Sequence, residues 1–216
     1  MSSEIKELLD GKVDSIYPPQ PFRNLIAQTQ FGPSSETHEQ FFSEMLAEID
    51  ALSTPYGFSN TLLEDADSNE SYRMLPKELN NRLRNQAKRM GENVVFGTVL
   101  FGRMQGGSGA DQAMGLFINT LPLHVDVSEA GVEESVRQTQ INLAALLEHE
   151  HASLALAQRC SGIPAGTQIF SAILNCRHHS GHSSDVADIA GLKLLGGKVI
   201  TNYPCAMSVD DFGTDL

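Results

Sequence analysis

The stretch NVVFGTVLFGRMQGGSGADQAMGLFINTLPLHVDV, residues 93–127, sets the class of fold. It holds two apolar runs, at 93–101 and 113–127, on either side of a loop that contains several glycines. Runs rich in β-branched and aromatic residues, bounded by turn residues, are typical of strands. We therefore expect two strands here. The second should be interrupted at Pro122, because proline cannot donate a hydrogen bond to a neighbouring strand.

The sequence before this stretch has mainly helical patterns. A short helical pattern at the start is followed by YPPQP, residues 17–21, where three prolines favour extended backbone. The pattern at 34–52 predicts an amphipathic helix, because Ser34 or Ser35 can cap it and its apolar residues form one stripe. That stripe consists of Phe41, Phe42, Met45, Leu46, Ile49 and Leu52. A second helix is predicted at 75–91, with Gly91 as its stop signal.

Helical and strand patterns are mixed after residue 127. We expect a long helix at 132–148, with Val136, Leu143, Leu146 and Leu147 facing inward, and a shorter helix at 152–160. The continuous apolar run at 167–176 predicts a strand buried on both faces. Short strands are expected near 192–195, 199–201 and 206–209. The predicted fold class is α/β, with a mixed β-sheet packed by helices.

The composition narrows the possible functions. The chain has 216 residues, of which 41% are hydrophobic, so it can bury one sizeable core. Its formal net charge of -12 disfavours binding to nucleic acid or to an anionic membrane. The densest basic run, Arg82, Arg84, Lys88 and Arg89, is expected to form a solvated helix face. With no apolar run of about 20 residues and no signal-peptide pattern, we expect a cytoplasmic protein.

The stretch CRHHSGHSSD, residues 176–185, looks most like a catalytic or metal site. If a strand extends that far, His178 and His179 point to opposite faces, and His182 lies in a serine-rich turn. Spacing alone supplies no complete set of metal ligands. The three cysteines form no CxxC pair, so neither a disulfide framework nor a zinc site is indicated. His149 and His151, two apart on a helix, diverge and cannot share a metal as an i, i+4 pair can.

Four motifs in a fixed order resemble a known family. They are GLFINTLPL at 115–123, LLEHEHASLALAQRCSGIP at 146–164, QIFSAILNCRH at 168–178, and GLKLLGGKVITNYPCAMSVDD at 191–211. Together with the segment that begins PFRNLIAQTQFG at 21–32, they resemble the condensation domains of non-ribosomal peptide synthetases. The resemblance covers nearly the whole chain.

The resemblance implies a fold of two lobes, each like a chloramphenicol acetyltransferase monomer. Peptide bonds form in a tunnel between the lobes, where the phosphopantetheine arms of two carrier proteins meet. The chain resembles the C-terminal lobe at 34–216, with 1–33 as the linker from an N-terminal lobe. An internal deletion is expected near 90–93, where family members carry an additional helix. The catalytic HHxxxDG motif belongs to the N-terminal lobe, and His178-His179 does not replace it, because the spacing leads to Ser183 instead of aspartate.

This resemblance makes Asn119, Thr120 and Arg103 candidates for lining the substrate channel, with the loop at 102–111 as a floor element. Asn119 has an alternative role, which is to satisfy backbone groups at the end of the strand. No catalytic residue, metal or tightly bound cofactor is expected. The expected partners are carrier proteins and a separate N-terminal lobe. Two alternatives stay open, a non-catalytic module that binds a carrier or completes a lobe, and a stand-alone acyltransferase that uses His178 or His179.

Overall fold

The structure is a computed structural model, and it describes residues 2–12, 21–49, 53–54, 71, 93–103, 113, 115–126, 131–164, 166–178 and 201–211. Its helices are α1 (Ser2–Leu9), α2 (Phe22–Phe31), α3 (Ser35–Met45), α5 (Val132–Glu148) and α6 (Leu154–Cys160). Its strands are β1 (Asn93–Leu100), β2 (Asn119–Asp126), β3 (Ala172–His178) and β4 (Cys205–Asp211). The helix expected at 75–91 and the strand expected near 192–195 lie outside the described residues. So does the strand expected near 199–201, apart from Thr201, which is not in a strand.

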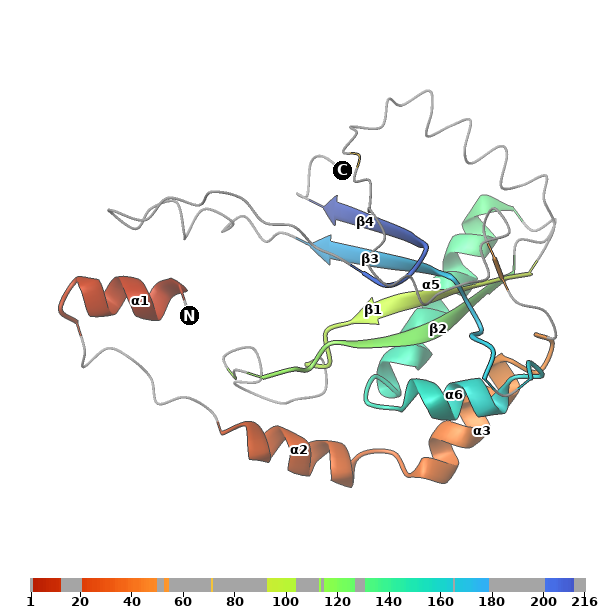
Figure 1. Cartoon of the computed structure of the whole chain (residues 1–216), viewed down its shortest axis with the longest axis horizontal. Helices are drawn as coiled ribbons and strands as arrows, with labels where there is room; N and C mark the ends of the chain where they lie inside the picture. Colours follow the sequence, from red (N-terminus) through yellow and green to blue (C-terminus); the bar gives the residue numbers. More distant parts are fainter. Residues whose placement is uncertain are drawn as a thin grey trace.

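The four described strands form one mixed sheet in the order β2-β1-β3-β4. β1 pairs antiparallel with β2 and parallel with β3, and β4 continues the sheet parallel to β3. Figure 1 shows the arrows of β1, β3 and β4 pointing the same way, with α3 and α6 below β2. The predicted α/β class, with a mixed sheet packed by helices, is confirmed.

The expected break at Pro122 is wrong. β2 runs from Asn119 to Asp126 without interruption, and Pro122 pairs with Gly97 of β1. β2 is an outer strand of the described sheet, so alternate N–H groups of β2 point away from β1. Proline fits at such a position because no hydrogen bond is lost there.

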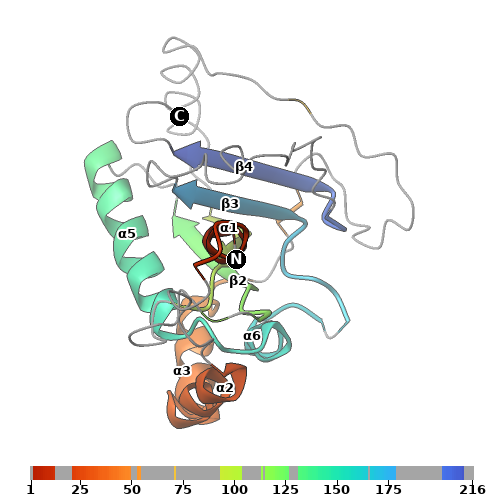
Figure 2. The same ribbon diagram turned by 90° about the vertical axis from the view of Figure 1, so that its left-hand side faces the viewer.

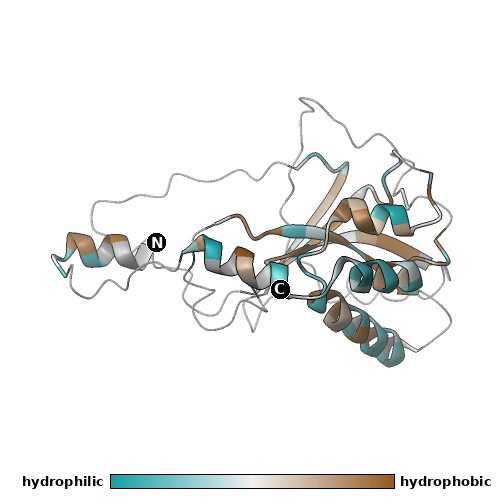
Figure 3. Ribbon diagram, turned by 90° about the horizontal axis from the view of Figure 1, so that it is seen from below, coloured by the Kyte–Doolittle hydropathy of each residue, from teal (hydrophilic) through white to brown (hydrophobic). Residues whose placement is uncertain are grey.

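The best-buried part of the core lies where the helices meet β2. Phe42 and Leu46 from the α3 region, Leu121 from β2 and Leu146 from α5 are all fully buried. The helix predicted at 34–52 is shorter in the structure, where it ends at Met45, although Ile49 beyond it is still buried. Ser34 caps α3 as predicted, because its hydroxyl accepts a hydrogen bond from the Thr37 N–H at 3.2 Å. Figure 3 shows mainly hydrophobic strands beside helices that carry residues of both kinds.

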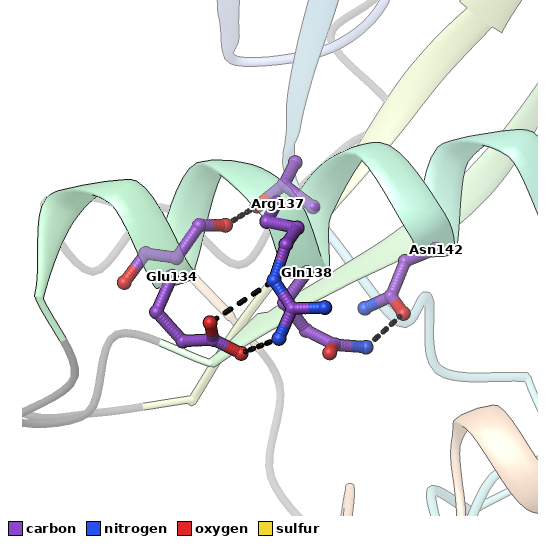
Figure 4. Close-up of polar contacts among 6 residues, drawn as sticks. Glu134, Arg137, Gln138 and Asn142 are labelled. Atoms are coloured by element: carbon purple, nitrogen blue, oxygen red, sulfur yellow. Dashed lines mark hydrogen bonds and ion pairs between the residues drawn. The ribbon is translucent and has the colours of Figure 1, made fainter.

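α5 has the predicted bounds, but only its second half contributes to the core. Leu143, Leu146 and Leu147 pack there, as predicted, and Asn142 Nδ2 donates to the His124 carbonyl of β2. Val136 is 58% exposed, so its predicted inward position is wrong. The first half of α5 carries polar contacts instead, including the Glu134–Arg137 ion pair and the Gln138–Asn142 hydrogen bond of Figure 4.

β3 is less buried than predicted. It lies between β1 and β4 and is parallel to both, as its apolar sequence suggests. Ile173 and Leu174 are only half-buried, however, and Cys176 is exposed. In the described part of the chain, α5 and α6 make their sheet contacts mainly with β2. Their cover therefore does not extend over both faces of β3.

α2 is a helix that the sequence reading of 1–33 as a linker did not predict. Pro21 precedes it in extended conformation, and Gly32 follows it. Phe22 in its first turn packs edge-to-face on Phe117, with 5.1 Å between the ring centroids. Figure 1 shows that α1, by contrast, lies away from the sheet, and in Figure 2 it is seen end-on in front of the sheet.

The chain turns sharply after β1 at Gly102, whose φ of +64° lies in the left-handed region. A Cβ atom at this position would overlap the carbonyl oxygen of Phe117. Backbone conformation and close approach therefore both require glycine.

We predict that Leu121→Ala lowers the free energy of unfolding by about 2–5 kcal/mol, because it leaves a cavity at a fully buried position. Leu116→Ala is the matched control, since Leu116 is 94% exposed, and should change stability by less than about 0.5 kcal/mol. Urea denaturation of both variants measures the difference. Equal losses would show that β2 does not pack as described.

We predict that Gly102→Ala is more destabilising than the same change at two other glycines. Gly131 has free space and a φ of -61° but is the N-cap of α5, where glycine is preferred over alanine, so Gly131→Ala should cost only about 0.5–1 kcal/mol. Gly11 has free space but a φ of +74°, and left-handed backbone costs an alanine about 1–2 kcal/mol. Gly102→Ala should exceed both in thermal or urea unfolding, because it adds the overlap with Phe117. An order in which Gly11→Ala costs most would contradict the geometry of this turn.

Candidate functional site

The candidate site lies at one edge of the sheet. The carboxyl ends of β1, β3 and β4 meet there, because the three strands are parallel, and antiparallel β2 begins there, with Asn119 paired to Leu100. In open α/β sheets, ligands bind outside the carboxyl ends of the strands. The structure thus brings three predicted positions, Asn119, Thr120 and Arg103, to one edge. The predicted floor loop at 102–111 is described only at Gly102 and Arg103.

The Asn119 side chain joins the start of β2 to the connection between α5 and α6. Its Nδ2 donates to the carbonyl oxygens of Glu150 at 2.9 Å and Ala152 at 2.8 Å. Its Oδ1 accepts from the Thr120 N–H at 2.9 Å. Both amide donors are therefore used by backbone carbonyls, which is the alternative role considered for this residue. Its role in lining a channel stays a prediction.

Thr120 lies on the other face of β2. It pairs with Val99 and is half-buried. Because successive strand residues point to opposite faces, Thr120 shares a face with Pro122, whereas Asn119 shares a face with Leu121. The two adjacent candidates thus cannot line the same side of the sheet.

Arg103 lies over an aromatic ring. Its guanidinium carbon is 4.6 Å from the centroid of Phe117, a cation–π distance, and Phe117 in turn contacts Phe22 of α2. Apolar side chains next to this group face outward, since Leu116 is 94% exposed and Ile118 is 65% exposed. At this edge of the sheet the Arg103 guanidinium, positioned over the Phe117 ring, therefore lies among exposed apolar side chains.

The histidines of 176–185 are placed only in part. β3 extends to His178, which pairs with Asp211 of β4, while His179 and His182 lie outside the described residues. The adjacent residue Arg177 forms an ion pair with Asp210, with Nε 2.8 Å from Oδ1. The spacing argument against a catalytic or metal role of His178, His179 and His182 stays a prediction.

A histidine contact that the sequence did not reveal lies beside the same α5–α6 connection. His149 follows the end of α5, and its Nδ1 is 2.7 Å from Nδ1 of His38 on α3. α5 ends at Glu148, so His149 and His151 do not lie on a helix. The Nε2 atom of His151 lies 3.6 Å from Glu150 Oε1. Burial lowers the pKa of His149 and of His38 below the ordinary value of 6.5. No sequence pattern indicates the pair, because 111 residues separate its members.

The described residues contain no cluster of three or more His, Cys, Asp or Glu side chains suited to a metal ion. None of their helices combines the length and the hydrophobicity that a membrane span requires.

Comparison with known proteins points to one family. No family model matches the chain. Malpibaldin synthetase of Mortierella alpina is 52% identical over 237 aligned positions, which take in 100% of this chain but 4% of the synthetase. Nonribosomal peptide synthetase 32 of Fusarium pseudograminearum is 29% identical over 57% of the chain, which corresponds to 1% of that protein. The chain thus spans a small fraction of the length of these relatives.

Solved structures agree with the sequence comparison. A mutant of the starter condensation domain of rhizomide synthetase, in complex with C8-CoA, matches with a TM-score of 0.60 and 19% identity. The match covers 79% of this chain and 42% of that domain structure. The chain therefore resembles malpibaldin synthetase over its whole length and has the fold of part of a condensation domain, and it corresponds to less than half of such a structure.

Proposed function

We propose that the chain acts as the C-terminal half of a condensation domain and supports amide bond formation between carrier-bound substrates. The observation that carries the proposal is the match of the whole chain to a peptide synthetase, together with a fold found within condensation domains. In this reaction an aminoacyl nitrogen attacks a thioester carbonyl carbon. The carbon–nitrogen bond forms, the carbon–sulfur bond breaks, and the departing thiol takes up a proton.

The chain is proposed to need an N-terminal lobe, either in the same polypeptide or as a separate protein. Its 216 residues contain no HHxxxDG motif. The rhizomide synthetase domain binds C8-CoA, which is an acyl thioester on a phosphopantetheine arm. We extend this substrate class to the present chain, so the arm of a carrier protein serves as substrate carrier and not as a bound cofactor. Carrier partners and a cytoplasmic location belong to the same proposal.

Exposed apolar side chains at the sheet edge support the proposal that an N-terminal lobe covers this edge. Leu116, Ile118 and Phe101 are all exposed there, beside the Arg103–Phe117 contact. Clustered exposed apolar groups mark interaction sites. Acidic carriers would need a basic surface on a chain with a net charge of -12, and the predicted basic run at 82–89 lies outside the described residues.

The alignment length supports the proposed internal deletion. The alignment to malpibaldin synthetase takes 237 positions, more than the 216 residues of this chain, so the relative carries residues that this chain lacks. We propose that they correspond to the additional helix expected near 90–93. The division into a linker at 1–33 and a lobe at 34–216 is part of the same proposal.

The alternatives make different predictions in a transfer assay. A non-catalytic module would bind carriers or a lobe without restoring turnover, and a stand-alone acyltransferase would work without a second lobe. The stand-alone acyltransferase would use His178 or His179, and His179 lies outside the described residues.

We predict that the isolated chain forms no amide product from loaded aminoacyl and peptidyl carrier proteins. Turnover should appear when an N-terminal lobe is added, for example the region of malpibaldin synthetase that precedes the aligned segment. Product formation is followed by mass spectrometry.

His179→Ala in the chain is the control, because it should leave the complemented turnover unchanged. Turnover by the chain alone that His179→Ala abolishes would support the stand-alone acyltransferase and overturn the proposal. Tight binding of the lobe without turnover would favour the non-catalytic module.

We predict different effects of substitutions at the two adjacent candidates. Asn119→Asp places a carboxylate against two carbonyl oxygens and should cost about 2–4 kcal/mol of stability, as lost donors leave buried acceptors unsatisfied. Thr120→Val keeps the shape of the side chain and should cost less than about 1 kcal/mol, while it lowers the complemented turnover. Urea unfolding and the transfer assay measure the two effects. Unchanged turnover in Thr120→Val would remove Thr120 from the channel.

A matched control for Asn119→Asp is Asn142→Asp. Asn142 Nδ2 makes a single bond to a carbonyl, that of His124, at 3.2 Å. Its replacement should therefore cost less than half as much. Equal costs would contradict the role of Asn119 as the double link to the α5–α6 connection.

A further inference from the structure

The contact between His38 and His149 joins α3 to the end of α5. The Nδ1 atoms are 2.7 Å apart, the rings meet at 68°, and the ring centroids are 4.9 Å apart. His149 is buried, and Phe41 stacks on its ring with 4.0 Å between the centroids. The pair is therefore held in place from both helices.

We propose that the His38–His149 pair is a proton-sensitive clasp that holds α3 against the α5–α6 connection and releases it in mild acid. This proposal is independent of the catalytic role of the chain. It assigns the pair a regulatory function that neither the family match nor the site at the sheet edge requires.

The chemistry of the contact makes it depend on protonation. An Nδ1-to-Nδ1 hydrogen bond needs one ring to donate and the other to accept. One added proton can be carried on Nε2 of the donor ring without loss of the bond. A second proton makes both Nδ1 atoms donors, and the two cationic rings then repel each other. The pair therefore titrates in two coupled steps.

The direction of the pH effect follows from the lowered pKa values of His38 and His149. Burial is the main cause that lowers the pKa of both His38 and His149, and the mutual repulsion of the rings lowers the pKa of His149 further. The unfolded chain, with ordinary values near 6.5, then binds more protons than the folded chain as the pH falls. The stabilisation that the pair contributes is therefore fully present when the pH is above the ordinary pKa of 6.5. It is lost as the pH falls from there through the lowered pKa values of the folded chain.

Other charged groups around the pair do not reverse this direction. His151 lowers the pKa of His38, and Glu148 raises the pKa of His149, but burial remains the largest cause for both. Glu36 and Glu39 flank His38 along α3, and Glu150 follows His149. The remaining charged or titratable residues on these elements are not among the causes of either shift. They are Glu44 on α3, Glu133, Glu134 and Arg137 on α5, Arg159 and Cys160 on α6, and His124 and Asp126 on β2.

Release of the clasp would affect the candidate site through a short path. The connection that His149 enters also supplies the Glu150 and Ala152 carbonyls to Asn119 at the start of β2. α3 follows α2 in the chain, and Phe22 of α2 packs on Phe117 at the same sheet edge. Loss of the clasp would therefore loosen α3, and with it α2 at this sheet edge, before the sheet itself unfolds.

The test measures the unfolding equilibrium constant of the full 216-residue chain by urea denaturation at about pH 7.5 and at about pH 5. Between these two pH values the unfolding equilibrium constant of the wild type should rise by a larger factor than that of His38→Gln, because only the wild type has the coupled pair whose pKa values are lowered. Glutamine can still hydrogen-bond to His149 but does not titrate. His151→Gln is the control, and it should keep most of the wild-type pH dependence.

Two measurements on the wild type keep the test decisive if a variant folds poorly. In NMR titrations of the wild type the His149 ring should have a midpoint below 6.5. Amide exchange at Leu46, whose N–H is bonded to the Phe42 carbonyl, should speed up in acid more than exchange within β1 and β2. A His149 midpoint at or above 6.5, equal pH dependence in wild type and His38→Gln, or uniform exchange in helix and sheet would overturn the proposal.

Discussion

Burial of the helix-facing side of β2 is the constraint on which the rest of the structure depends. Leu121 is fully buried among side chains from the α3 region and from α5, and β1 is held to β2 along its whole length. Each fully buried leucine or phenylalanine contributes about 1.5–3 kcal/mol. β1 then serves as the base on which β3 and β4 add in parallel. The packing of the helices on β2 therefore fixes the position of the sheet edge that carries the candidate site.

The α5–α6 connection links the packed helices to the candidate site. Its backbone carbonyls receive both donors of Asn119 on one side, and its His149 meets His38 on the other. A connection between helices usually lies at the surface with its polar groups in water. Here its polar groups are bound by two residues from distant parts of the chain. The position of α3 and the start of β2 are thus linked through four consecutive residues.

The functional interpretation follows from what the chain contains and what it leaves exposed. It has a mixed sheet of the kind found in condensation domains, yet it matches only 42% of a solved one. Its sheet edge carries exposed apolar side chains around Arg103, and its sequence lacks the HHxxxDG motif. The proposed partner lobe, which would cover this edge and supply the histidine, accounts for both observations.

The sequence by itself determined the bounds of α5 and the resemblance to condensation domains. Apolar periodicity predicted α5 with its observed bounds, because seventeen residues of one helical pattern need no long-range information. The ordered motifs identified the condensation-domain resemblance. Whether Pro122 breaks β2, whether Val136 faces inward and how deeply β3 is buried depend on where each element lies in the sheet or under a helix. Only the tertiary structure decided these points, and only it brought His38 to His149 and Asn119 to Glu150, because contacts between residues far apart in the chain leave no periodic pattern in a single sequence.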